Sequence, residues 1–163
     1  MNKQMLADIR FSFDHELIPH HLEGEDMMAF VNQINKNGDE FLANLLNVYV
    51  MTMAKEMGIR EDDVPVFSAD EFTVSSMMAQ GDDSMVFLYV TLPENDDENM
   101  CTVRYVFACD IAARTVRYFL VERREGVYAL CEIKDGESKM HCRGSLDKIE
   151  VLSAVSYVLQ QAE

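Results

Sequence analysis

The stretch TVRYFLVERREGVYALCEIK, residues 115–134, decides the fold class of this 163-residue chain. On either side of Glu125-Gly126, apolar residues alternate with polar ones, and this period of two is typical of β-strands. A Glu-Gly pair between two such runs favours a two-residue hairpin turn, because glycine adopts the positive φ angles that tight turns need. We therefore predict an antiparallel hairpin with Leu120 opposite Cys131.

Similar runs before and after this hairpin extend it into a meander. A four-residue loop at 111–114 places Tyr105 opposite Leu120, and the only connection longer than a hairpin loop is expected at 93–99. A loop at 135–138 places Cys131 opposite Cys142. The six predicted strands are Phe72–Ala79, Met85–Leu92, Cys101–Asp110, Thr115–Arg124, Val127–Lys134 and Lys139–Arg143. We expect five or six of these strands to form an antiparallel sheet.

Helices are predicted before the strands. Apolar residues spaced three and four apart predict one helix over 25–37 and a second over 39–58. Asn37-Gly38 separates them, because glycine ends a helix without strain. Nearer the start, residues 4–14 alternate with a period of two, which favours a strand; a short helix is the alternative.

A helix is also predicted after the strands. Asp147 is a suitable N-cap, with Glu150 three residues later as its capping-box partner and a buried stripe that ends at Leu159. The complete expectation is an α+β fold in one domain, residues 1–163. It has two N-terminal helices, a five- or six-stranded antiparallel meander and a C-terminal helix, with the helices packed on one sheet face.

The predicted register sorts the last four strands into two sides. The tyrosine side has Glu122 as its only charged residue and is expected to be core. Its members are Val103, Tyr105, Phe107, Cys109, Val116, Tyr118, Leu120, Glu122, Val127, Ala129, Cys131, Ile133, Met140 and Cys142. The opposite side, which we call the arginine side, comprises Thr102, Arg104, Val106, Ala108, Arg117, Phe119, Val121, Arg123, Tyr128, Leu130, Glu132, His141 and Arg143.

The arginine side is the candidate binding surface. Arginine and aromatic residues are enriched where proteins meet partners, because they combine contact area with fixed hydrogen-bonding geometry. The alternative is an ordinary solvent-facing side whose arginines pair with Glu132 or with the acidic helices. The candidate binding residues are Arg104, Arg117, Arg123, Arg143, Phe119, Tyr128, His141 and Glu132.

Charge and hydropathy restrict the possible partners. The net charge of −15 argues against sequence-independent nucleic-acid binding, which depends on Lys and Arg neutralising phosphates. No apolar run is long enough for a membrane span, and no secretory signal is visible, so a cytoplasmic protein is expected. The four cysteines form no C-x-x-C pair and are interpreted as buried thiols.

The segment HELIPHH, residues 15–21, resembles the helical motif of zinc proteases only superficially. That motif needs two histidines four positions apart, and the residue four after His15 is Pro19. We expect a solvated loop here. A looser metal site formed by His15, His20, His21, Glu16 and Glu23 stays open, although the sequence gives no positive reason to assign a metal.

No catalytic residues are identified. His141 has Cys142 only as a chain neighbour, expected on the opposite side of the strand, and no glycine-rich phosphate loop follows a strand. We predict a non-enzymatic protein-interaction or chaperone-like domain that binds a protein partner, or a second copy, through the arginine side, without a cofactor. One alternative is a small-ligand binder or enzyme with a pocket on the sheet. The other is an acidic DNA-mimic inhibitor.

Overall fold

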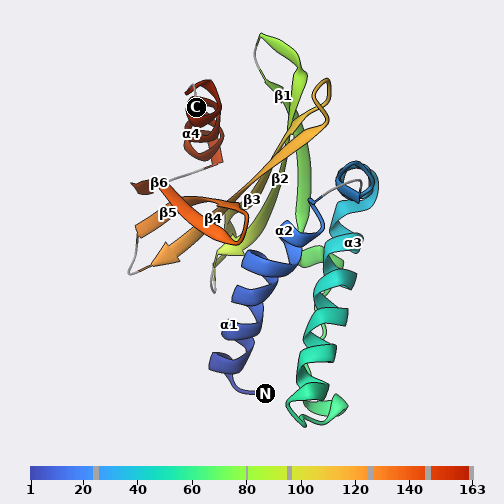
Figure 1. The fold of residues 1–163 in the computed structure, drawn as a ribbon. Coiled ribbons are helices and arrows are strands. Elements are labelled where there is room, and N and C mark those ends of the chain that lie inside the picture. Colours follow the sequence, from blue (N-terminus) through green and yellow to red (C-terminus); the bar gives the residue numbers. More distant parts are fainter. Residues whose placement is uncertain (24–25, 80, 95–96, 125–126, 146–147, 162–163) are drawn as a thin grey trace. The chain divides into compact units, whose positions relative to one another are not determined.

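The computed structural model describes residues 1–23, 26–79, 81–94, 97–124, 127–145 and 148–161. The chain divides into two compact units, Met1–Phe72 and Thr73–Glu163. The first unit is helical, and the second contains the sheet and the last helix (Figure 1). The predicted α+β class and the meander order are confirmed. The single-domain assignment stays a prediction, and the two units are described separately.

The first unit begins with a helix, where alternation favoured a strand. α1 spans Lys3–Ser12, and the Asn2 side chain caps it by accepting a hydrogen bond from the Met5 N–H. Ile9 and Phe13, four residues apart, are both buried, which is the helical spacing of a core-facing stripe. The strand interpretation of residues 4–14 is therefore wrong, and the short-helix alternative is correct.

The chain stays helical through the proline for which we predicted a loop. Phe13–Leu17 forms a π-helical segment and is followed by α2, Ile18–His20. The Ile18 N–H donates to the carbonyl of Phe13, five residues back, so the turn is wider than an α-helical one. This wider turn accommodates Pro19, which has no N–H to donate and would clash with an α-helical carbonyl.

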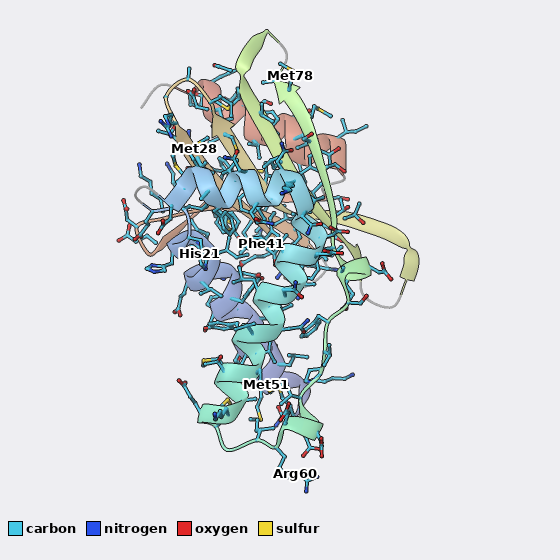
Figure 2. The ribbon with its side chains drawn as sticks, turned by 90° about the vertical axis from the view of Figure 1, so that its right-hand side faces the viewer. His21, Met28, Phe41, Met51, Arg60 and Met78 are labelled. Atoms are coloured by element: carbon cyan, nitrogen blue, oxygen red, sulfur yellow. The ribbon has the colours of Figure 1, made fainter. Side chains whose placement is uncertain are left out.

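α3, Asp26–Glu56, contains both of the helices predicted after the loop. Asn37, with φ −156° and ψ 45°, breaks it into two arms at the predicted boundary, and the arms run in clearly different directions (Figure 2). Phe30 and Phe41 make an edge-to-face contact across the break, with ring centroids 5.4 Å apart. Other buried residues of the arms are Val31, Ile34, Leu42, Ala43, Leu46, Val50 and Ala54.

Two short 3₁₀ turns, Glu61–Asp63 and Ala69–Glu71, complete the first unit. Asn47 of α3 holds the segment between them by two hydrogen bonds with the backbone of Phe67, at 2.8 and 2.7 Å. A capping box between Ser68 and Glu71 fixes the second turn. None of the described helices is long and apolar enough to cross a membrane.

The second unit is a six-stranded antiparallel sheet in the order β1 to β6, followed by α4, Lys148–Gln160. Leu120 pairs with both Tyr105 and Cys131, so the predicted register of the central strands is confirmed. The proposed cap Asp147 lies outside the described residues. The strands are β1 Thr73–Ala79, β2 Asp82–Glu94, β3 Asp97–Asp110, β4 Thr115–Arg124, β5 Val127–Lys134 and β6 Glu137–Gly144.

The long loop expected at 93–99 is wrong, because β2 continues to Glu94 and β3 begins at Asp97. The misleading signal was Pro93, which cannot donate to a ladder and therefore suggested a break. β1 pairs with β2 only as far as Thr91. Pro93 therefore lies where β2 pairs with β3 alone, which is an edge position that tolerates proline.

Two register shifts change which side some residues occupy. Arg104 is an extra residue between the pairs Val90–Tyr105 and Thr91–Val103, and His141 is an extra residue between Leu130–Cys142 and Cys131–Met140. An inserted residue reverses the phase of the strand beyond it. Val103 accordingly joins the core on the arginine side, as does Cys142. Arg143 pairs with Ala129 of the tyrosine side.

The β5–β6 turn is shorter than expected. Asp135 and Gly136, with φ of 53° and 77°, form a two-residue turn that pairs Lys134 with Glu137. Cys131 therefore faces Met140 and not Cys142. Cys109, Cys131 and Cys142 are free thiols.

Both sides of the sheet carry buried residues. On the tyrosine side, Tyr105, Phe107 and Tyr118 are at most 2% exposed, as expected for core. On the arginine side, α4 inserts Val151, Leu152 and Val155. Their sheet partners in this cluster are Phe87, Tyr89, Val103, Val106, Ala108, Phe119, Val121 and Leu130. From sequence we expected this side to be free of helices, so the placement of α4 is a correction.

This packing predicts the effect of truncating α4. Val155 is fully buried, so Val155→Ala should lower the free energy of unfolding by about 2 kcal/mol, through lost burial and a residual cavity. Ser153→Ala, at an exposed position of the same helix, should change it by less than about 0.5 kcal/mol. Urea unfolding followed by circular dichroism measures both values, and equal effects of the two substitutions would contradict the packing of α4.

Candidate functional site

The predicted binding residues lie at several different places on the sheet. Arg117, Phe119, Glu132 and His141 come together on the arginine side. Arg123 and Tyr128 form a separate pair further along β4 and β5. Arg104 lies at the β3 bulge, and Arg143 belongs to the tyrosine side, so the expectation that all four arginines share one side is wrong for Arg143.

Glu132 is the centre of the polar cluster. Arg117 Nε donates to Glu132 Oε2 and Arg117 Nη2 to Oε1, both at 2.6 Å. His141 Nε2–H donates to Oε1 at 3.0 Å. Bidentate arginine–carboxylate geometry is among the strongest polar contacts in proteins, so the cluster fixes β4, β5 and β6 to one another.

The bulge in β6 is what brings His141 into this cluster. As the extra residue of the strand, it stays on the arginine side next to Phe119, with ring centroids 6.0 Å apart. The Arg117 guanidinium lies over the same ring, 5.5 Å from its centroid. The side chains of Glu132 and His141 are 9% and 13% exposed, and that of Arg117 is 37% exposed. Arg117 is therefore the most accessible member of the ion pairs.

Glu132 is held in its charged form. Burial alone would raise its pKa, but hydrogen bonds from Arg117 and His141, together with their positive charges, outweigh burial and place the pKa below the ordinary value. The carboxylate in turn neutralises Arg117. The cluster therefore resembles a satisfied structural network more than an open site for an anionic ligand.

The other arginines of this side also have contacts within the sheet. The Arg123 guanidinium lies 5.8 Å from the centre of the Tyr128 ring, and Arg104 Nη1 donates to the carbonyl of Val121 at 3.4 Å. These contacts agree with the alternative stated from sequence. In that alternative the arginine stems cover apolar neighbours and Glu132 is a pairing partner. Of the arginine side, Arg123 remains exposed.

Two of the thiols, Cys109 and Cys142, are poorly suited to nucleophilic catalysis. Burial raises the pKa of Cys109 to about 12 and also raises the pKa of Cys142. A reactive cysteine needs the reverse shift, because the thiolate is the nucleophile. His141 and Cys142 lie on the same side, contrary to expectation, but the His141 Nε2 is engaged with Glu132.

His15 and His21 stack on different aromatic residues. His15 stacks on Phe11 and donates from Nδ1 to the Phe11 carbonyl, whereas His21 stacks on Phe30. Burial, followed by the nearby charge of His20, lowers the pKa of His21. Within the part of the chain that the structure describes, no three His, Cys, Asp or Glu side chains are grouped as metal ligands.

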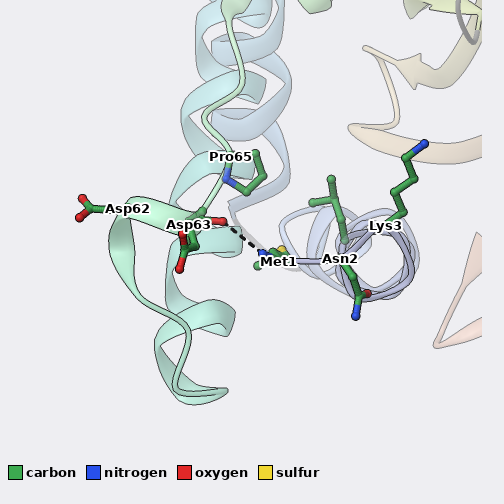
Figure 3. A pocket seen from close by; sticks show the side chains of 8 residues that line it. Met1, Asn2, Lys3, Asp62, Asp63 and Pro65 are labelled. Carbon is green, nitrogen blue, oxygen red and sulfur yellow. Dashed lines mark hydrogen bonds between the residues drawn. The ribbon is translucent and has the colours of Figure 1, made fainter.

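A pocket lies in the first unit. It is an open depression between the start of α1 and residues 62–65, with Lys3, Asp62 and Asp63 among its lining residues (Figure 3). The amino group of Met1 donates to the Asp63 carbonyl at 3.4 Å across it. No aromatic residue lines it, so it lacks the enclosed apolar wall that small-molecule sites usually have.

The two edges of the sheet differ sharply in chemistry. The edge strand β6 carries Glu137, Lys139 and Arg143 and is bulged at His141, and both devices discourage the pairing of another strand. The other edge strand, β1, reads TVSSMMA and has no charge and no proline. Within the described residues, β1 pairs with β2 alone. It is therefore an unprotected edge.

Two methionines flank this unprotected edge. Met77 pairs with Phe87 on the arginine side, and Met78 pairs with Val86 on the tyrosine side. They are 47% and 56% exposed. From sequence we compared the sides of the sheet and not its edges, and so did not predict this feature, although the charge-free run at 73–79 was a readable signal.

Comparison of the chain with protein-family models, with curated proteins and with solved structures finds no match. The candidate sites therefore depend on the geometry of this chain alone. They are the Glu132 cluster, whose charged groups pair with one another, and β1, which pairs with β2 alone within the described residues.

The Glu132 cluster predicts a specific acid sensitivity. Because folding lowers its pKa, Glu132 stabilises the fold above the ordinary value of 4.5, and this contribution is lost as the pH falls through the folded-state pKa. Glu132→Gln should lower stability at pH 7 by about 1–3 kcal/mol, because it leaves Arg117 without its carboxylate. Below pH 4.5 the difference from the parent chain should shrink.

Urea unfolding over a pH series measures this difference. Glu137→Gln, at an exposed position of β6, is the control and should leave the pH profile unchanged. A difference between Glu132→Gln and the parent that stays constant across the acid range would show that Glu132 does not titrate as described.

Proposed function

We propose that this chain is a non-enzymatic protein-interaction domain that binds an extended segment of a protein partner by strand addition to β1. The observation that carries the proposal is the contrast between the two edges of one sheet. β6 carries charges and a bulge at His141 that discourage pairing, whereas β1 is uncharged and pairs regularly with β2 from Thr73 to Met78, with a register shift only at its end, before Ala79. An uncharged edge strand that lacks such devices is a site of aggregation, so its retention favours a partner strand that pairs with it.

Strand addition explains which groups would give affinity. An edge strand presents a row of backbone N–H and C=O groups, and a partner strand satisfies them with main-chain hydrogen bonds. Each such bond contributes about 0.5–1.5 kcal/mol net. Met77 and Met78 add apolar contact on both sides of the edge, and their flexible side chains adapt to different partner residues.

This proposal relocates the interaction surface that the sequence suggested. α4 already packs on the arginine side, and its arginines contact Glu132, Phe119, Tyr128 and Val121. In this proposal the arginine side has a structural role, because it holds the strands together and packs against α4. Exposed Arg123 would make an additional contact with the partner. A chaperone-like role fits the same edge, since strand addition is one way in which a chaperone can hold a partner segment.

We place the domain in the cytoplasm as part of the same proposal. Cys109, Cys131 and Cys142 are free thiols, and the first two are buried in the sheet. Unbridged cysteines are the usual state in reducing compartments, which supports this location.

The test uses a defined peptide. Its core alternates Thr and Val over the length of β1 and is flanked by uncharged residues, and the protein is isotopically labelled for NMR. Binding should slow amide hydrogen exchange within Thr73–Ala79 and leave β6 unchanged. A peptide of identical sequence with alternate backbone amides N-methylated is the control and should not bind, since it cannot complete the ladder.

Two results would contradict the proposal. One is equal binding of the methylated and unmethylated peptides, which would indicate side-chain adhesion and not strand addition. The other is slowed exchange in β6, or in neither edge strand, at peptide concentrations that saturate the protein.

A further inference from the structure

The β1–β2 hairpin has charge of one sign only. From Glu61 to Val103 the chain has no Lys, Arg or His. β1 itself is uncharged, and the charged residues of β2 are Asp82, Asp83 and Glu94. Ala79, the last residue of β1, pairs with Asp82. Asp82 and Asp83 therefore stand in the chain beside the end of the unprotected edge.

The other half of the sheet has mixed charge with a basic excess. β4 carries Arg117, Arg123 and Arg124 against Glu122, and β6 carries Lys139 and Arg143 against Glu137. The sheet is therefore polarised from an acidic β1 end to a more basic β6 end. At physiological salt the Debye length is about 8 Å, so a strand added to β1 experiences mainly the local acidic charge.

This polarity disfavours a second copy of the chain as the partner of β1. Each copy carries a net charge of −15, and a symmetric β1–β1 pair would bring two purely acidic hairpins together. Like charges close together across strands are destabilising. A head-to-tail pair of β1 with β6 would meet the bulge at His141, which breaks the regular ladder.

Resting on the proposed function, we infer that the partner of β1 is an extended protein segment with an uncharged core and Lys or Arg residues at its flanks. The uncharged core matches TVSSMMA, whose centre offers no countercharge. The basic flanks match the negative charges of Asp82, Asp83 and Glu94. Charge then selects the partner, and the backbone ladder supplies the affinity.

The experiment compares peptides with the same Thr/Val core and with lysine, glutamate or uncharged flanks. Fluorescence anisotropy at low salt should show the lysine-flanked peptide binding about three- to tenfold more tightly than the uncharged one, as for exposed ion pairs, and the glutamate-flanked one more weakly. Raising the salt should bring the three affinities together.

A pair of variants with equal change in net charge locates the effect. Asp82→Asn/Asp83→Asn removes two negative charges at the end of β1, and Glu137→Lys changes the net charge by the same amount at the β6 edge. The first should abolish most of the preference for lysine flanks, and the second should preserve it. Circular dichroism checks that both variants fold.

The outcomes separate the inference from the proposed function. If no peptide slows exchange in β1, strand addition itself fails. If peptides bind but the glutamate-flanked one binds as tightly as the lysine-flanked one, or if both variants lose the preference equally, the inference about basic flanks is wrong. Light scattering that finds a dimer with slowed exchange in β1 would instead assign the edge to a second copy.

Discussion

The pairing register of β3, β4 and β5 is the constraint on which the second unit depends. With Leu120 opposite both Tyr105 and Cys131, every second residue of three strands falls on the same side. That phase buries Tyr105 and Tyr118 on one side and leaves the other with an apolar stripe for Val151, Leu152 and Val155 of α4. A slip of one residue would exchange the two sides completely, so the alternation of the sequence specifies this register strongly.

The fold class and central register could be predicted because they follow from local alternation and turn chemistry. The bulges at Arg104 and His141 could not, since an inserted residue leaves the sequence pattern intact while reversing the phase beyond it. The Asp135-Gly136 turn was readable, because Asp-Gly favours a two-residue turn, and the longer loop we assumed shifted the expected β5–β6 pairing by two residues. The bulge at His141, and not the loop length, moves Cys142 and Arg143 to the sides they occupy. Helix α1 was predicted as a strand because the apolar pattern of so short a segment fits the strand period of two as well as the helical spacing of three and four.

The candidate site was predicted in part, and for a physical reason. Residue types indicated that Arg117, Phe119, Glu132 and His141 would lie near one another, and they do. The residue types could not reveal that these side chains form hydrogen bonds and ring contacts with one another, on the side of the sheet where α4 packs. Edge chemistry, in contrast, depends on which strands end the sheet, and this becomes visible only once the strand order is known. The contrast between β1 and β6 indicates that the candidate binding groups are backbone N–H and C=O groups of an edge strand, and not side chains on a face of the sheet.

The central claim is that β1, the end strand of the sheet, has no strand paired along its outer side in the free chain. Residue-resolved amide hydrogen exchange of the free protein tests it directly. In an edge strand, alternate amides point toward the neighbouring strand and away from it, so exchange within Thr73–Ala79 should alternate between slow and fast, with the bulge near Ala79 as an exception. Uniformly slow exchange along the strand would mean that another segment already pairs with it, and β1 would then be no free edge to which a partner strand could add.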